Sequence, residues 1–160
     1  MTRFGELLRA LIAGGVDYVV VGGVAAAAHG SARATQVVDI VYRRDPGNLK
    51  RLVKALGGLH PYLRGAPPGL PFRFDAETLA QGSNFTLTTS LGWIDLLGEI
   101  AGGGKFENLI CHAITVEVFG VECRIVDLPT LIQTKRAAGR PKDLESIAEL
   151  EVIRERSQGN

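Results

Sequence analysis

The sequence predicts an α+β fold, in which a mixed β-sheet is flanked by helices, and three patterns lead to that prediction. The run Tyr18–Val21 is apolar or aromatic at every position, as in an interior strand whose two faces are both covered. Residues 36–42 are rich in β-branched side chains, which favours a second strand. Residues 3–13 and 142–155 instead carry apolar residues at helical spacing, so helices are expected on either side of the sheet-forming region.

The first half of the chain is predicted to alternate helices and strands. Glycine or proline marks most of the boundaries, because glycine ends a helix or strand and proline is tolerated at the first helical turn. The predicted elements are a helix over 3–13, a strand over 18–21, a helix over 24–29, a strand over 36–42, and a helix from Pro46 to Gly57-Gly58. Four of the seven prolines fall between residues 60 and 73, which predicts a loop there.

The second half is predicted to complete the sheet and then end in helices. The expected elements are strands over 84–89 and 93–97, a glycine-rich flexible segment over 99–105, a hairpin over 113–119 and 122–126, a helix after Asp127, and a last helix over 142–155. Trp93 is expected in the core. We expect a single domain over residues 1–160, with a core over 16–127 and C-terminal helices over 128–155.

Composition limits the classes of function. The net charge of +1 and the pI of about 7.8 provide no broad positive field, so tight binding to long nucleic acid is not expected from charge alone. Cys111 and Cys123 are expected to be reduced core thiols. No segment has the roughly 20 consecutive apolar residues of a membrane span, and the amino terminus lacks the apolar run of a signal peptide. A cytoplasmic location is expected.

Two acidic residues stand out because they lie inside apolar strands. Asp39 is predicted to share a strand face with Val37, and Asp95 lies within the strand over 93–97. A buried carboxylate is costly unless it has a partner or a function. Phosphoryl transfer from a nucleoside triphosphate uses carboxylates of this kind to hold divalent metal ions.

Gly22-Gly23 precedes the predicted helix over 24–29. Glycines here would let backbone amides approach phosphate oxygens at the start of a helix, where an anion is favoured. A simple strand-to-helix turn explains the same pair, and the glycines by themselves are a weak signal. Their spacing to Asp39 strengthens the phosphate interpretation.

These motifs together resemble the small bacterial nucleotidyltransferases of the polymerase-beta-like superfamily, including the minimal and abortive-infection-type members. Such proteins have an apolar strand ending in Gly-Gly or Gly-Ser, then a helix, an Arg-x-Thr-x-Asp-x-Asp strand, and a later strand with a third Asp. The chain matches with Val21-Gly22-Gly23, Arg33-Ala34-Thr35-Gln36 with Asp39, and Ile94-Asp95-Leu96. The resemblance covers residues 16–150 and implies a polymerase-beta-like palm fold.

The resemblance also implies roles for individual residues. It makes Asp39 and Asp95 the catalytic and metal-binding carboxylates, with Mg²⁺ or Mn²⁺ as the cofactor. The residues implied in nucleotide binding are Gly22, Gly23, Arg33, Thr35 and Lys135. A solvated helix face is the open alternative for Lys135, and a brace for the loop before the second strand is the open alternative for Arg33.

One departure from the family pattern bears on activity. Val37 occupies the place of the first Asp, and valine cannot coordinate Mg²⁺. The metal is therefore expected to be weakly held if at all, with little or no turnover.

Three functions remain open on the sequence. The first is a weakened or inactive nucleotidyltransferase that binds a nucleoside triphosphate and is related to enzymes that act on a hydroxyl acceptor, such as a protein or RNA. The second is a non-catalytic pseudoenzyme that binds nucleotide or a protein partner, for instance in a toxin-antitoxin pair. The least favoured is an RNA binder that uses the basic segment 135–142, because the net charge is near zero.

Overall fold

A computed structural model describes residues 1–158 of the chain. The α-helices are α1 (Phe4–Ala13), α2 (Gly22–Ala28), α3 (Pro46–Leu56), α4 (Ala76–Gln81), α5 (Phe106–Leu109), α6 (Leu128–Ala138) and α7 (Pro141–Gln158). Short 3₁₀ turns follow α3 and α5. None of the helices in the described part of the chain is long and apolar enough to cross a membrane.

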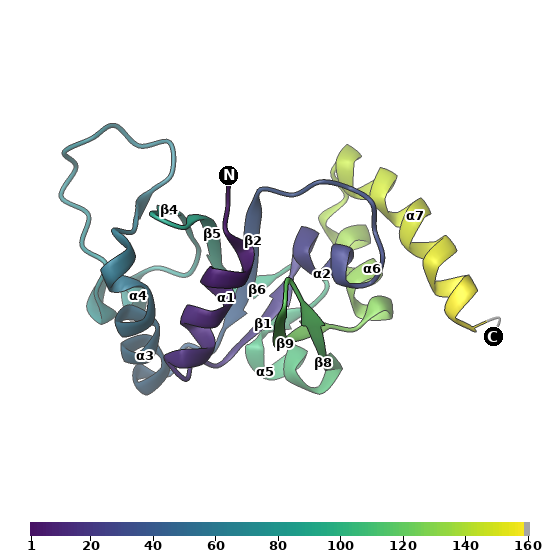
Figure 1. Cartoon of the computed structure of the whole chain (residues 1–160), viewed down its shortest axis with the longest axis horizontal. Helices are drawn as coiled ribbons and strands as arrows, with labels where there is room; N and C mark the ends of the chain where they lie inside the picture. Colours follow the sequence, from purple (N-terminus) through teal and green to yellow (C-terminus); the bar gives the residue numbers. More distant parts are fainter. Residues whose placement is uncertain (159–160) are drawn as a thin grey trace.

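A seven-stranded mixed sheet forms the centre of the fold, in the order β3-β4-β5-β2-β1-β9-β8. Its strands are β1 (Tyr18–Val21), β2 (Val37–Tyr42), β3 (Tyr62–Leu63), β4 (Phe85–Thr89), β5 (Gly92–Leu97), β8 (Ala113–Val118) and β9 (Val121–Val126). Strands β2 and β5 are parallel, as are β1 and β9, and the other neighbours are antiparallel. Figure 1 shows α3 and α4 on the left, α6 and α7 on the right, and β2, β1, β9 and β8 between them.

The apolar strand β1 lies in the interior of this sheet, as the sequence predicted. All four residues of β1 are buried, because β1 lies between β2 and β9 and is covered by helices. On β2, Val38, Ile40 and Tyr42 are fully buried on one face, and the other face carries Val37, Asp39 and the buried Val41. The hydrophobic core therefore fixes which face of β2 turns toward the candidate site.

Three predicted segments differ from the structure. Gly22 and Gly23 lie inside α2, whose first residue is Gly22, and do not form a turn before it. The proline-rich segment contains the short edge strand β3, which pairs with β4. The glycine-rich segment over 99–105 is a two-stranded hairpin of β6 (Glu99–Ile100) and β7 (Gly104–Lys105). Sequence patterns missed these pairings because each strand has only two residues.

Three side chains lie in different surroundings from those predicted. Both cysteines are free, as expected, but only Cys123 is buried and Cys111 is exposed. Trp93 is 44% exposed, because it lies on the face of β5 that carries Asp95 and not on the core face. Leu144, one of the apolar residues whose helical spacing predicts the last helix, is 57% exposed.

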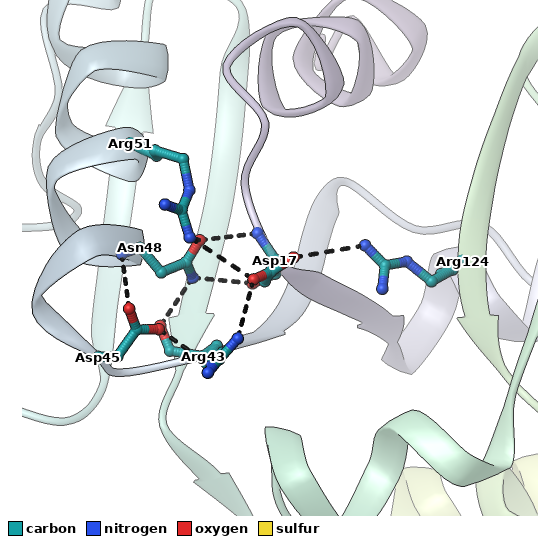
Figure 2. A network of polar contacts seen from close by, with 6 residues as sticks. All are labelled: Asp17, Arg43, Asp45, Asn48, Arg51 and Arg124. Carbon is teal, nitrogen blue, oxygen red and sulfur yellow. Dashed lines mark hydrogen bonds and ion pairs between the residues drawn. The ribbon is translucent and has the colours of Figure 1, made fainter.

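A polar network fastens the start of β1 to α3 (Figure 2). Asn48 is fully buried and accepts a hydrogen bond from the Asp17 backbone N–H at 2.7 Å. Its amide donates to the backbone carbonyls of Asp17 and Arg43, at 3.0 and 2.7 Å. Around it, the Asp17 carboxylate lies within 4 Å of three arginines: Arg43, Arg51 and Arg124. The network holds the end of the central strands farthest from the two carboxylates of the candidate site.

Candidate functional site

Two carboxylates lie side by side on the central strands. Asp39 on β2 and Asp95 on β5 are register partners in a parallel pair, so their side chains leave the same face of the sheet. The next register pair on the same face is Val37 and Trp93, two residues along each strand. The aliphatic and aromatic side chains therefore stand beside the acidic pair on that face.

Glycine at position 22 is required by the position of Asp39. Its φ is +66°, and a Cβ built there would lie 2.2 Å from the Asp39 Oδ2 atom. Gly23 is similarly close to Thr35, whose Oγ1 would lie 2.7 Å from a Cβ at position 23. The Gly22-Gly23 pair thus lets α2 begin directly against the acidic strand and the segment before it.

Arg64 forms an ion pair with Asp95 that no sequence pattern indicated. Its Nη2 donates to Asp95 Oδ1 at 2.5 Å, and the two side chains are only 22% and 19% exposed. Arg64 follows the edge strand β3, two strands away from β5. Only the β3–β4–β5 pairing brings this residue to the acidic pair.

The opposite wall of the site comes from α6 and α7. Lys135 on α6 lies 3.9 Å from Asp143, a carboxylate that is almost completely buried. Arg140, just before α7, donates to Asp143 at 2.7 Å through Nε. Burial lowers the pKa of Lys135, although the charge of Asp143 opposes that shift. Burial would raise the pKa of Asp143, but hydrogen bonds and charge from Arg140 outweigh it and leave that pKa lowered.

These walls enclose a cleft of about 630 Å³. All seven residues that the sequence put forward for the site line it: Gly22, Gly23, Arg33, Thr35, Asp39, Asp95 and Lys135. Val37, Arg64, Arg140 and Asp143 line it as well. Arg33 is half exposed and lies 3.5 Å from Glu145 of α7. Residues that are scattered through the sequence therefore share one cavity, while their individual roles stay predictions.

Asp39 is held in an unfavourable electrostatic environment. Burial, followed by the charge and contact of Asp95, raises the pKa of Asp39 to about 7. Arg64 and Lys135 oppose this shift without cancelling it. A carboxylate kept under such conditions is typical of a functional site, where perturbed pKa values gather.

This environment gives a prediction for stability and pH. The folded-state pKa of Asp39 lies above its ordinary value of 3.8, so the folded protein binds the extra proton and loses stability as pH rises from 3.8 to about 7. We expect Asp39→Asn, which is neutral at every pH, to raise the free energy of unfolding by about 1 to 3 kcal/mol at pH 8. At pH 4 the two proteins should be nearly equal.

Urea unfolding at the two pH values measures the difference. The matched control is Glu77→Gln, which removes an exposed carboxylate on α4. If Asp39→Asn is less stable than the wild type at pH 8, the claim that the buried acidic pair destabilises the fold at that pH is wrong.

The donor set does not fit a two-metal site. Within residues 1–158, no group of three or more His, Cys, Asp or Glu side chains is arranged to hold a metal ion. Val37 offers no oxygen ligand, and Asp95 is already paired with Arg64. The residues that line the cleft therefore do not provide the oxygen ligands of two divalent ions.

Comparison with solved structures identifies the fold. The lincomycin-bound lincosamide antibiotic adenylyltransferase LnuA superposes with a TM-score of 0.61 at 14% identity, over 95% of this chain and 98% of that one. ANT(2'')-Ia in complex with adenylyl-2''-tobramycin gives 0.57 at 14% identity, over 98% and 97% of the two chains. A proposed nucleotidyltransferase from Thermotoga maritima gives 0.55 at 16% identity, over 93% and 94%.

The chain has a nucleotidyltransferase-like fold. This confirms the fold class predicted from the sequence, a mixed sheet flanked by helices with further helices at the C-terminal end. No family model and no curated protein matches the sequence. At identities of 14 to 16%, the likeness establishes the nucleotidyltransferase-like fold and leaves activity to be argued from the cleft.

Proposed function

We propose that the cleft binds a nucleoside triphosphate and that the chain transfers nucleoside monophosphate to a hydroxyl acceptor slowly or not at all. One observation carries the proposal: Asp39 and Asp95 lie in register in the lining of one cleft, and Gly22 leaves room beside Asp39. This arrangement is costly to the fold, as the raised pKa of Asp39 indicates. A nucleotide site explains why it is retained.

Basic side chains supply the attraction for phosphate. Arg33 and Lys135 enter the cleft from different segments, and Arg140 and Lys142 line the same wall. Charge-assisted hydrogen bonds from such side chains are the strongest that a protein offers a phosphate oxygen. Gly22, Gly23 and Thr35 are proposed to contact the triphosphate where α2 meets the acidic strand.

Slow or absent turnover follows from Val37. One structural neighbour is a lincosamide antibiotic adenylyltransferase with lincomycin bound, and another, ANT(2'')-Ia, is in complex with adenylyl-2''-tobramycin. In this chain Val37 removes one acidic ligand and Arg64 engages another, so Mg²⁺ or Mn²⁺ is held weakly if at all. Antibiotic hydroxyls belong among the acceptors to be tested, beside protein and RNA.

A partner-binding role is the second candidate, and Val37 is also the observation that favours it. A non-catalytic member of this fold, for instance one half of a bacterial toxin-antitoxin pair, needs no complete carboxylate set. It predicts capture of a partner protein that is unaffected by nucleotide. A cytoplasmic location and a single domain over residues 1–160 are part of either proposal.

Binding and transfer are tested together with each of the four α-³²P-labelled ribonucleoside triphosphates. We expect at least one to bind with a dissociation constant below about 1 mM, and little or no label to pass to protein, RNA or antibiotic acceptors. Absence of binding by all four would refute the nucleotide proposal. Robust transfer that depends on Mg²⁺ or Mn²⁺ would refute the inactivity.

Lys135 gives a matched prediction for the same assay. Replacing it by glutamine should weaken triphosphate binding about tenfold, because a largely buried ammonium that faces the cleft is lost. The control, Lys54→Gln, removes an exposed lysine at the end of α3 and should leave affinity within about twofold. Equal losses in the two variants would show that Lys135 has no specific role.

A further inference from the structure

The acidic pair already has a cation, and that cation belongs to the chain. The Arg64 guanidinium lies 2.5 Å from Asp95, in a site where both side chains are mostly buried. Arginine stays protonated throughout the physiological range. Arg64 therefore balances the negative charge of Asp95 without any ion from solution.

Arg64 is held in this place from several directions. Its backbone N–H donates to the Thr86 carbonyl at 2.9 Å, which extends the β3–β4 pairing by one residue. Its Nη1 donates to the Leu87 carbonyl at 3.3 Å, and its guanidinium lies 5.2 Å from the centre of the Trp93 ring. Thr86 and Asp95 are register partners, so the arginine reaches across β4 to the acidic pair.

The same contacts leave little opportunity for a divalent ion. Mg²⁺ needs near-octahedral oxygen coordination and gives up its water reluctantly. One oxygen of Asp95 accepts from Arg64, and Val37 supplies none. An ion at Asp95 would have to break a buried ion pair or lie directly beside a guanidinium.

We infer that Arg64 takes the place of a divalent cation, so that the cleft binds a nucleoside triphosphate without Mg²⁺. The second half of this inference rests on the proposed function. Three positively charged side chains then balance the negative charges of the phosphates and of the acidic pair: Arg64, Arg33 and Lys135. Val37 and Arg64 act as a matched pair, in which one omits an ion ligand and the other supplies the missing positive charge.

Binding of Mn²⁺, followed by electron paramagnetic resonance, tests the first half without any nucleotide. The wild type should leave the signal of free Mn²⁺ nearly unchanged. Val37→Asp should bind Mn²⁺ weakly, and Val37→Asp combined with Arg64→Gln should bind it at least about tenfold more tightly than Val37→Asp does.

The control for this series combines Val37→Asp with Arg73→Gln. Arg73 is an exposed arginine of the segment between β3 and α4, outside the residues that line the cleft. This variant should match Val37→Asp alone. If removing Arg64 tightens Mn²⁺ binding no more than removing Arg73 does, or if the wild type already binds Mn²⁺ strongly, the inference is overturned.

The unmodified protein tests the second half. Affinity for the four ribonucleoside triphosphates is measured by calorimetry, once with Mg²⁺ and once with EDTA, and should differ by less than about threefold between the two conditions. Binding that occurs only with Mg²⁺ would overturn the inference and leave the proposed function standing. No binding in either condition would overturn the proposed function, and with it the nucleotide half of the inference.

Discussion

Replacing Asn48 by alanine should lower the free energy of unfolding by about 3 kcal/mol, the largest loss we expect from a single polar side chain here. Asn48 is fully buried and makes three hydrogen bonds to backbone groups of Asp17 and Arg43 (Figure 2). Truncation removes these bonds and leaves buried backbone donors and acceptors without partners. Such orphaned groups cost more than the net value of the bonds themselves.

Chemical denaturation measures this loss. The control is Lys50→Ala, which removes an exposed side chain from the same helix and should change stability by less than about 0.5 kcal/mol. If Asn48→Ala unfolds at the same denaturant concentration as the control, the network in Figure 2 does not hold the start of β1.

Replacing Gly22 by valine should both destabilise the fold and disrupt the site. A Cβ at position 22 would overlap the Asp39 carboxylate, and the φ of +66° is strained for a β-branched residue. We expect a loss of about 2 to 4 kcal/mol, together with loss of measurable triphosphate binding. Thermal unfolding and calorimetry with the triphosphate that binds the wild type report the two effects.

Two further variants separate the causes. Gly57→Ala places a methyl group in open space at a residue with helical backbone angles, so it should be neutral or stabilising. Asp39→Ala should add more stability to Gly22→Val than it adds to the wild type, because in the variant it also relieves the clash, while the backbone strain stays. Changes in stability that are strictly additive between the two single variants and the double variant would contradict a direct contact between the two residues.

The acidic residues and most of the local elements could be read from the sequence, but the short helices α4 and α5 could not. Apolar and β-branched runs predict the strands around Asp39 and Asp95. Pro46, Asp127 and Pro141 mark the starts of α3, α6 and α7. A carboxylate in an apolar strand is conspicuous because burial is costly. Both acidic residues, and the valine at position 37, were therefore visible before the fold was known.

Long-range pairing could not be read in the same way. That β2 and β5 are parallel and place the two carboxylates in register depends on a sheet order that local patterns do not encode. Arg64 was missed because it lies in a proline-rich stretch without periodicity and reaches Asp95 only through β3 and β4. Trp93 was assigned to the core because an aromatic residue within an apolar strand looks the same whichever face it occupies.

A crystal structure of the protein grown with a non-hydrolysable triphosphate analogue, in EDTA, tests the central claim most directly. We expect the phosphates inside the cleft, in contact with Lys135 and Arg33, with Arg64 still paired to Asp95. An empty cleft at saturating analogue, or a nucleotide bound on another surface, would contradict the claim that this acidic pair serves a nucleotide site.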